Sequence, residues 1–214
     1  MRRIASALAA LSAVLVFELA LADDIAVPPD LQASLLAKVV SYDRNLAERA
    51  GDRVHTLLVG KPKDPTSMPF IRQVRQALGE IATFGSYPHD EQIVEFSTAA
   101  ALVEKCRAER ISIVYLGPGL HDDIDAIRNA LEPLSILTVS ASPEEVLRGV
   151  ILGFDLVQGK PKLVIHLPQA RKQHINMQSD VLKLMRIVET VVGSSSFRTQ
   201  ELRAISTLGS ARFF

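Results

Sequence analysis

Residues 117–121 gather the groups of this chain that are best placed to bind a ligand. Gly117, Pro118 and Gly119 follow an apolar run and precede a helical pattern, which is where α/β proteins bind anions. His121 comes directly after them. Pro118 breaks the GxGxxG spacing of a dinucleotide-binding turn, and turns of this kind are commonly plain connections. These four residues are therefore a candidate loop for a ligand or a partner.

Acidic residues crowd the same place. His121, Asp122, Asp123 and Asp125 offer nitrogen and carboxylate ligands for a divalent cation. Acidic side chains in the first turn of a helix also stabilise its dipole without a metal. We favour the second interpretation and predict no metal and no other cofactor.

An earlier loop resembles a phosphate-binding loop only superficially. Gly60, Lys61 and Pro62 follow a predicted strand and precede a predicted helix. A second glycine and the Gly-Lys-Ser/Thr ending are missing, and Pro62 removes a backbone N–H donor. We expect no phosphate site here.

The chain offers no evident nucleophile. Cys106, its one cysteine, shares a helical face with Ala99 and Leu102, which predicts a buried apolar side chain without an activating histidine. His166 and His174 are eight residues apart, a spacing that matches no standard zinc pattern, and His166 is expected in surface or second-layer packing. No Gly-x-Ser-x-Gly elbow is present. We therefore predict no catalytic residue and a protein that is not an enzyme.

The elements that must position these residues alternate along the chain. After a helix at 31–42, strand-like runs at 54–59, 92–96, 111–116 and 135–139 alternate with helical periods at 70–81, 99–106 and 124–131. Residues 111–116 are nearly all apolar, as in a strand covered on both faces. The pattern predicts an α/β fold: a three-layer mixed sheet, mainly parallel with an antiparallel C-terminal hairpin, and helices on both faces.

The hairpin is the clearest local pattern. Apolar residues alternate over 150–156 and 163–167, and Gln158-Gly159-Lys160-Pro161 between them is typical of a turn. Val181, Leu184, Met185 and Val188 then fall at i, i+3, i+4 and i+7, which predicts a helix packed on the hairpin.

The first 22 residues are predicted to be a signal peptide. Two arginines, an apolar run and Ala20-Leu21-Ala22 place the cleavage between Ala22 and Asp23; an uncleaved anchor is the alternative, which the interruption at Glu18 disfavours. Residues 23–190 are expected to form a single domain. Residues 191–214, which begin with a Gly/Ser-rich tract, are expected to form a mobile tail.

The balance of positive and negative side chains argues against a nucleic acid as partner. The chain carries 24 Lys+Arg and 24 Asp+Glu, so it lacks the basic excess of a nucleic-acid-binding protein. With the predicted export signal, we expect the mature chain to lie outside the cytoplasm and to have no nucleic acid as partner.

The hairpin region resembles the YfiR family of periplasmic regulators. The resemblance lies in Val150-Ile151-Leu152-Gly153-Phe154, the Gly turn, Ile165-His166-Leu167, Ala170-Arg171, Met177-Gln178-Ser179 and the following leucines, together with the helix from Leu35 to Tyr42. It covers most of residues 31–190. Two departures are a single cysteine where family members commonly have disulfide-forming pairs, and Asp43-Arg44-Asn45 where many members have an aromatic-rich Trp-Pro ending.

Membership implies a non-enzymatic α/β regulator, often dimeric. Such a protein binds the periplasmic sensor domain of a membrane-anchored signalling protein, a diguanylate cyclase, and lowers its cyclic-di-GMP output, with effects on biofilm formation and motility. With only Cys106 present, redox control through an internal disulfide is excluded. The alternative function is a periplasmic small-ligand-binding protein or transporter accessory, with a crevice at the strand ends near Gly60 or Gly117.

Overall fold

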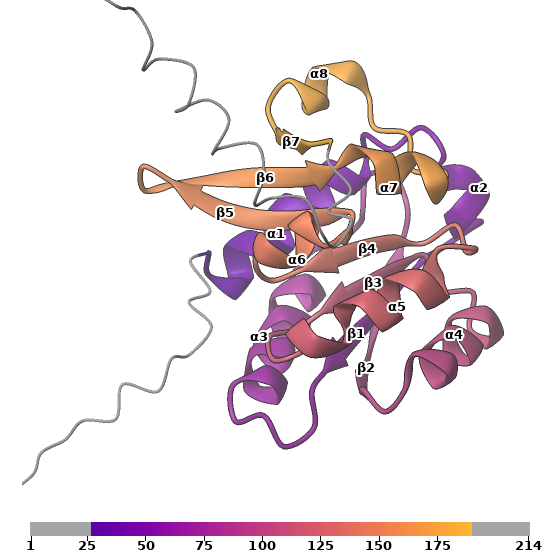
Figure 1. Ribbon diagram of the computed structural model, residues 1–214. Helices are drawn as coiled ribbons and strands as arrows, with labels where there is room; N and C mark the ends of the chain where they lie inside the picture. Colours follow the sequence, from indigo (N-terminus) through magenta and orange to yellow (C-terminus); the bar gives the residue numbers. More distant parts are fainter. Residues whose placement is uncertain (1–26, 190–214) are drawn as a thin grey trace, which may run out of the picture.

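The computed structural model describes residues 27–189 (Figure 1). The predicted signal peptide 1–22, its cleavage between Ala22 and Asp23, and the tail 191–214 lie outside these residues and stay predictions. Within residues 27–189, no helix combines the length and the apolar character that crossing a bilayer requires.

Helices and strands alternate along the described chain. The helices are α1 (Pro29–Val40), α2 (Leu46–Ala50), α3 (Ser67–Gly79), α4 (Ala99–Ala108), the 3-10 turn η1 (His121–Asp123), α5 (Ile124–Leu131), α6 (Glu144–Leu147), α7 (Leu167–Lys172) and α8 (Ser179–Leu182). The strands are β1 (Val54–Gly60), β2 (His89–Glu95), β3 (Ile113–Leu116), β4 (Leu137–Ser140), β5 (Leu152–Val157), β6 (Lys160–His166) and β7 (Arg186–Val188).

These strands form one mixed sheet in the order β2-β1-β3-β4-β5-β6-β7. Only β5 and β6 pair antiparallel; the other neighbouring strands are parallel. The predicted α/β fold, mainly parallel with an antiparallel hairpin, is confirmed.

Each face of the sheet buries its own apolar core. Leu58, Ile113 and Tyr115 point to the face that α1 and α3 cover, while Leu57 and Val114 point to the face under α4 and α5 (Figure 1). Successive strand residues alternate between the two cores, as the pleat requires. The sheet is therefore the middle of three layers.

A buried glutamine ties α1 to the sheet. Gln32 is fully buried, and its side-chain Nε2 donates to the carbonyls of Val27 (2.8 Å) and Ala141 (3.2 Å). The hydroxyl of Tyr115, on β3, donates to Gln32 Oε1. Complete burial raises the pKa of Tyr115 well above its usual value, so the hydroxyl keeps the proton that it donates.

Cys106 is buried in the core beneath α4, as predicted, with 2% of its surface exposed. Burial raises the pKa of its thiol, the charge of Glu109 adds to this and the charge of Lys105 opposes it, and the net pKa is about 12. The side chain therefore packs as an apolar group and is not an activated nucleophile.

One prediction is wrong, namely the helix inferred from the spacing of Val181, Leu184, Met185 and Val188. Only α8 is helical, and the chain then enters β7, which pairs parallel to β6. Val181 and Met185 are buried, but 69% of Leu184 is exposed. The backbone of β6 offers unpaired groups at its edge, and pairing with them outweighs a helical period of only four residues.

Replacing Tyr115 with Phe should destabilise the fold. The substitution leaves Gln32 Oε1 buried without its donor, a loss of about 1–3 kcal/mol in the free energy of unfolding. Urea denaturation measures it. The control Tyr42→Phe removes a hydroxyl from a side chain that is 39% exposed, and should change stability by less than about 0.5 kcal/mol. Equal stability of the two variants would contradict the role given to the network.

Cys106 should react with thiol reagents only when the protein unfolds. At pH 8 a thiol of pKa about 12 is ionised to roughly one part in 10⁴, and reagents reach a buried sulfur poorly. We expect labelling by a chromogenic disulfide reagent to be slow in buffer and immediate in denaturing urea. Rapid labelling of the folded chain would show that the thiol is accessible.

Candidate functional site

The predicted ligand or partner loop lies at the point where the strand order reverses. Gly117, Pro118 and Gly119 follow β3, beside Gly60 and Lys61 at the end of β1, and β1 is the strand from which the chain builds the sheet in both directions. Ligands of open α/β sheets bind at such a position. The loop therefore stands at the end of the sheet where such proteins bind ligands, and its use as a binding loop stays a prediction.

Side chains of the chain itself pack around this loop. Lys61 Nζ forms an ion pair with Asp123 and lies 5.7 Å from the centre of the Phe96 ring. Gly119 has a positive φ of 80°, and a Cβ there would come within 2.4 Å of an Asp64 carboxylate oxygen. Asp64 therefore packs directly against Gly119, and Lys61 is engaged by Asp123.

Asp64 is held by the start of α3. Its Oδ1 accepts hydrogen bonds from the backbone N–H groups of Thr66 (2.8 Å) and Ser67 (2.9 Å) and from the Thr66 hydroxyl (2.7 Å). Partial burial raises the pKa of Asp64, but the bonds from Thr66 and Ser67 and the charge of Lys61 lower it more, and the net pKa falls below its usual value. The carboxylate stays charged and fixed.

The acidic residues after the loop point to separate partners. Asp125 pairs with Arg148 (2.6 Å), and Asp123 pairs with Lys61. His121 Nδ1 lies 3.8 Å from Glu145, whose other oxygen accepts from the hydroxyls of Ser140 and Ser142. Across residues 27–189, no three His, Cys, Asp or Glu side chains are arranged to hold a metal ion.

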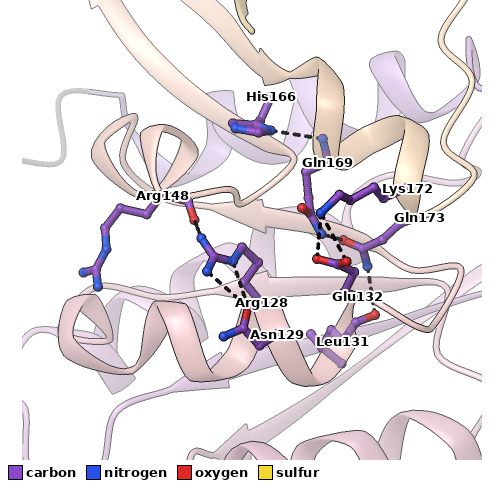
Figure 2. Close-up of polar contacts among 9 residues, drawn as sticks. All are labelled: Arg128, Asn129, Leu131, Glu132, Arg148, His166, Gln169, Lys172 and Gln173. Carbon is purple, nitrogen blue, oxygen red and sulfur yellow. Dashed lines mark hydrogen bonds and ion pairs between the residues drawn. The ribbon is translucent and has the colours of Figure 1, made fainter. Parts of the chain in front are cut away.

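His166 lies in the second layer and not at the surface. It is 2% exposed and caps α7, where its Nδ1 accepts a hydrogen bond from the Gln169 N–H at 3.1 Å (Figure 2). The strand alternation placed it correctly opposite the α1-side core, but it could not show that α7 would cover that opposite face.

A small polar pocket of about 120 Å³ lies beside His166, between α5 and α7. The charged side chains that line it have partners within the protein. Lys172 pairs with Glu132 at 3.2 Å, and Arg128 donates a hydrogen bond to the Arg148 carbonyl at 2.7 Å (Figure 2). Beneath it Gln173 donates to the carbonyls of Leu131, Leu134 and Ile136. These contacts fasten α7 to the rest of the fold and leave no free charge to recognise a ligand.

A larger apolar groove of about 310 Å³ runs between α1, β6 and α8. It is lined by apolar side chains with two lysines and one aspartate, namely Leu35, Lys38, Val39, Tyr42, Pro161, Lys162, Leu163, Asp180, Val181 and Leu184. Leu184 on one wall is 69% exposed and Tyr42 on the other is 39% exposed. We call this surface the α1–α8 groove. Exposed large apolar residues around a hollow mark interaction sites on proteins.

A buried polar cluster joins the two walls of the groove. Asp43, just after α1, accepts from the backbone N–H of Asn176 (2.9 Å) and of Asn45 (3.1 Å), and pairs with the buried Arg49 at 2.6 Å. Backbone bonds from Arg44 to Asn176 and from Gln178 to Tyr42 run alongside. The segment that leads into α8 is therefore bound directly to the end of α1.

Sequence reasoning missed the α1–α8 groove. Its walls come from segments more than a hundred residues apart, and the helical period assigned Leu184 to the core. The one available signal was the departure at Asp43-Arg44-Asn45, which the structure shows to be part of the polar cluster.

Solved structures with this fold come from substrate-binding proteins among others. The chain is similar to an ABC domain in complex with L-Trp from Streptococcus pneumonia (8% identity, TM-score 0.56, covering 75% of this chain and 62% of that one). It is also similar to a ligand-free, open substrate-binding protein with adhesive properties from Clostridium difficile (8% identity, TM-score 0.51, covering 68% of this chain and 58% of that one). A third similar structure is a conserved domain protein from Vibrio cholerae O1 biovar eltor (16% identity, TM-score 0.52, covering 75% of this chain and 60% of that one).

These likenesses establish the fold. The chain spans about three fifths of the length of the structures that it matches. None of the curated protein sequences matches it.

A family model gives a more specific result. The model described as YfiR/HmsC-like matches residues 30–186, from the first turn of α1 to the start of β7. The match includes both walls of the α1–α8 groove, the polar cluster at Asp43 and the hairpin. The chain belongs to the YfiR/HmsC-like family.

Proposed function

We propose that this protein is a periplasmic regulator that binds and restrains the sensor domain of a membrane-anchored signalling protein, a diguanylate cyclase, and so lowers cyclic-di-GMP output. Family membership supports the proposal, because the family is regulatory and not enzymatic. The single observation that carries it is the α1–α8 groove, whose walls expose Leu184 and Tyr42.

The groove suits contact with another protein. Its lining is mostly apolar and includes Lys38, Lys162 and Asp180, and protein interfaces likewise combine an apolar core with polar groups. Its walls are held by buried polar contacts, so a partner meets a preformed surface and little ordering is needed on binding.

Restraint follows from preferential binding. The regulator must bind the inactive state of its partner more tightly than the active state, and shifting the ratio from 1:99 to 99:1 takes about 5.5 kcal/mol of differential affinity. No chemistry on the partner is needed. The charged residues near the strand ends pair with one another, Lys61 with Asp123 and Arg148 with Asp125, and this mechanism does not require them.

A second function, the binding of a small ligand, is favoured by one observation. The loop with Gly117, Pro118, Gly119 and His121 stands at the strand ends where open α/β sheets bind ligands; one protein of similar fold is a substrate-binding protein and another is in complex with L-Trp. A ligand there would displace Lys61 from Asp123 and bind to its ammonium group.

Deleting the gene should raise cellular cyclic-di-GMP in a strain with its cognate cyclase intact. Complementation with the wild-type gene should restore the low level, and Leu184→Asp should fail to restore it because a buried interface does not accept an unpaired carboxylate. Mass spectrometry of nucleotide extracts gives the measurement.

The control variant is Leu147→Asp. Leu147 is 43% exposed on α6, away from the α1–α8 groove, and its replacement should complement fully. Thermal unfolding of both purified variants tests whether each is folded. Unchanged cyclic-di-GMP on deletion would count against the regulator, and full complementation by Leu184→Asp would count against the groove.

The second function predicts a thermal shift. L-tryptophan and small anionic metabolites, all of which carry a carboxylate or phosphate for Lys61, should be tested. A ligand at 100 times its dissociation constant adds about 2.7 kcal/mol to the free energy of unfolding. Lys61→Met should abolish the shift, whereas Lys63→Met, at a nearby exposed lysine, should keep it. No shift with any compound at millimolar concentration would rule out binding at this crevice.

A further inference from the structure

The β5–β6 hairpin extends beyond the rest of the sheet as a ribbon of two strands. β4 pairs with β5 only at Leu152 and Gly153, and β7 pairs with β6 only at 164–166. From Phe154 outward, neither strand has a third neighbour among the described residues, and the ribbon projects from the molecule (Figure 1).

The end of this ribbon has a defined turn. Val157 pairs with Lys160, and the two residues between them, Gln158 and Gly159, have φ values of 52° and 72°. Positive φ at both positions is the two-residue type I′ turn that fits the twist of a hairpin. The ribbon therefore ends in a compact point, although Lys160 and Pro161, expected in the turn, already belong to β6.

Apolar side chains stand at this point without cover. Leu156 is 40% exposed and Val157 is 45% exposed, and as consecutive strand residues they point to opposite faces of the ribbon. An isolated two-stranded ribbon is marginal in water, and leaving apolar residues at its end adds nothing to its stability. The arrangement suggests that the tip enters an apolar medium.

The charge around the tip is positive. Lys160 and Lys162 lie on its second strand, and Lys38 of α1 meets Lys162 at the α1–α8 groove. No carboxylate within residues 27–189 pairs with these three lysines. The nearby acids have other partners: Asp155 pairs with Arg186 (2.9 Å) and Asp180 with Lys183 (2.8 Å).

We propose that the tip formed by residues 156–162 docks on an anionic phospholipid surface. Leu156 and Val157 would enter the boundary between head groups and acyl chains, and the lysines would contact the phosphates. A projecting tip of this kind fits a lipid surface, whereas the concave α1–α8 groove fits a protein. Docking would concentrate the regulator at the membrane where a membrane-anchored partner resides.

Vesicle sedimentation tests the proposal directly. The exported protein, purified from the periplasmic fraction, should bind vesicles of phosphatidylethanolamine with 30% phosphatidylglycerol and should bind phosphatidylcholine vesicles much less. Raising the salt should weaken binding. Since each lysine near an anionic surface contributes about fivefold, Lys160→Gln with Lys162→Gln should lower the partition coefficient roughly 25-fold. Lys63→Gln is the control and should bind like the wild type.

The absence of tryptophan from the sequence allows a second readout. Leu156→Trp places a single fluorophore at the tip, and its emission should move to shorter wavelength when anionic vesicles are added. Leu147→Trp, at a similarly exposed leucine on α6, should not respond. Both variants change exposed positions, so folding is expected to be retained and circular dichroism checks it.

The outcomes separate clearly. A wild-type protein that does not sediment with anionic vesicles overturns the proposal, as does equal binding by the double-lysine variant. Loss of cyclic-di-GMP control in tip variants of a protein that never binds vesicles would instead assign the tip to a protein contact. The proposed regulation through the α1–α8 groove is tested by Leu184→Asp, and its outcome does not depend on whether the tip binds lipid.

Discussion

The side chain of Gln32 is the contact on which the position of α1 depends. One amide, without access to water, bonds to the carbonyls of Val27 and Ala141 and to the hydroxyl of Tyr115. A buried amide must have its partners or the fold loses free energy, so a shift of α1 along the sheet would be opposed by the loss of the bonds to Ala141 and Tyr115. Apolar packing alone would let the helix slide. Because α1 forms one wall of the α1–α8 groove, this polar contact also determines the shape of the groove.

The other wall is held by the same means. Asp43 accepts hydrogen bonds from the backbone N–H groups of Asn45 and Asn176 and pairs with Arg49, and it fastens the segment before α8 to the end of α1. The two proposed interaction surfaces are therefore built differently. The groove is concave and braced by buried polar contacts, whereas the hairpin tip is convex and supported only by its own ladder. A protein partner and a lipid surface make opposite demands on shape, and the two surfaces meet at Lys162.

Sequence patterns predicted the sheet well because each signal is local. The apolar run before Gly117 indicated a strand buried on both faces, and Gln158-Gly159 indicated the hairpin turn. The fold around Met185 was not predictable, since four apolar residues at helical spacing cannot reveal that the edge of β6 is free to pair. The candidate loop at Gly117 stays a prediction. Asp64, which packs against Gly119, and Lys61, which pairs with Asp123, come from a segment that no local pattern links to this loop. The α1–α8 groove depends on elements far apart in sequence and appeared only in the structure.

The two edges of the sheet have different chemistry. β2 forms one edge and carries His89, Asp90, Glu91 and Glu95, with Asp90 bonded to His55 of the neighbouring strand. Charged side chains along an edge resist pairing with another strand. β7 at the other edge is only three residues long and contains the exposed Ile187. Within residues 27–189, the β2 edge therefore resists pairing with an added strand more than the β7 edge does. If two chains paired edge to edge through β7, each free end of the joined sheet would be a β2 edge, which does not favour growth into a filament.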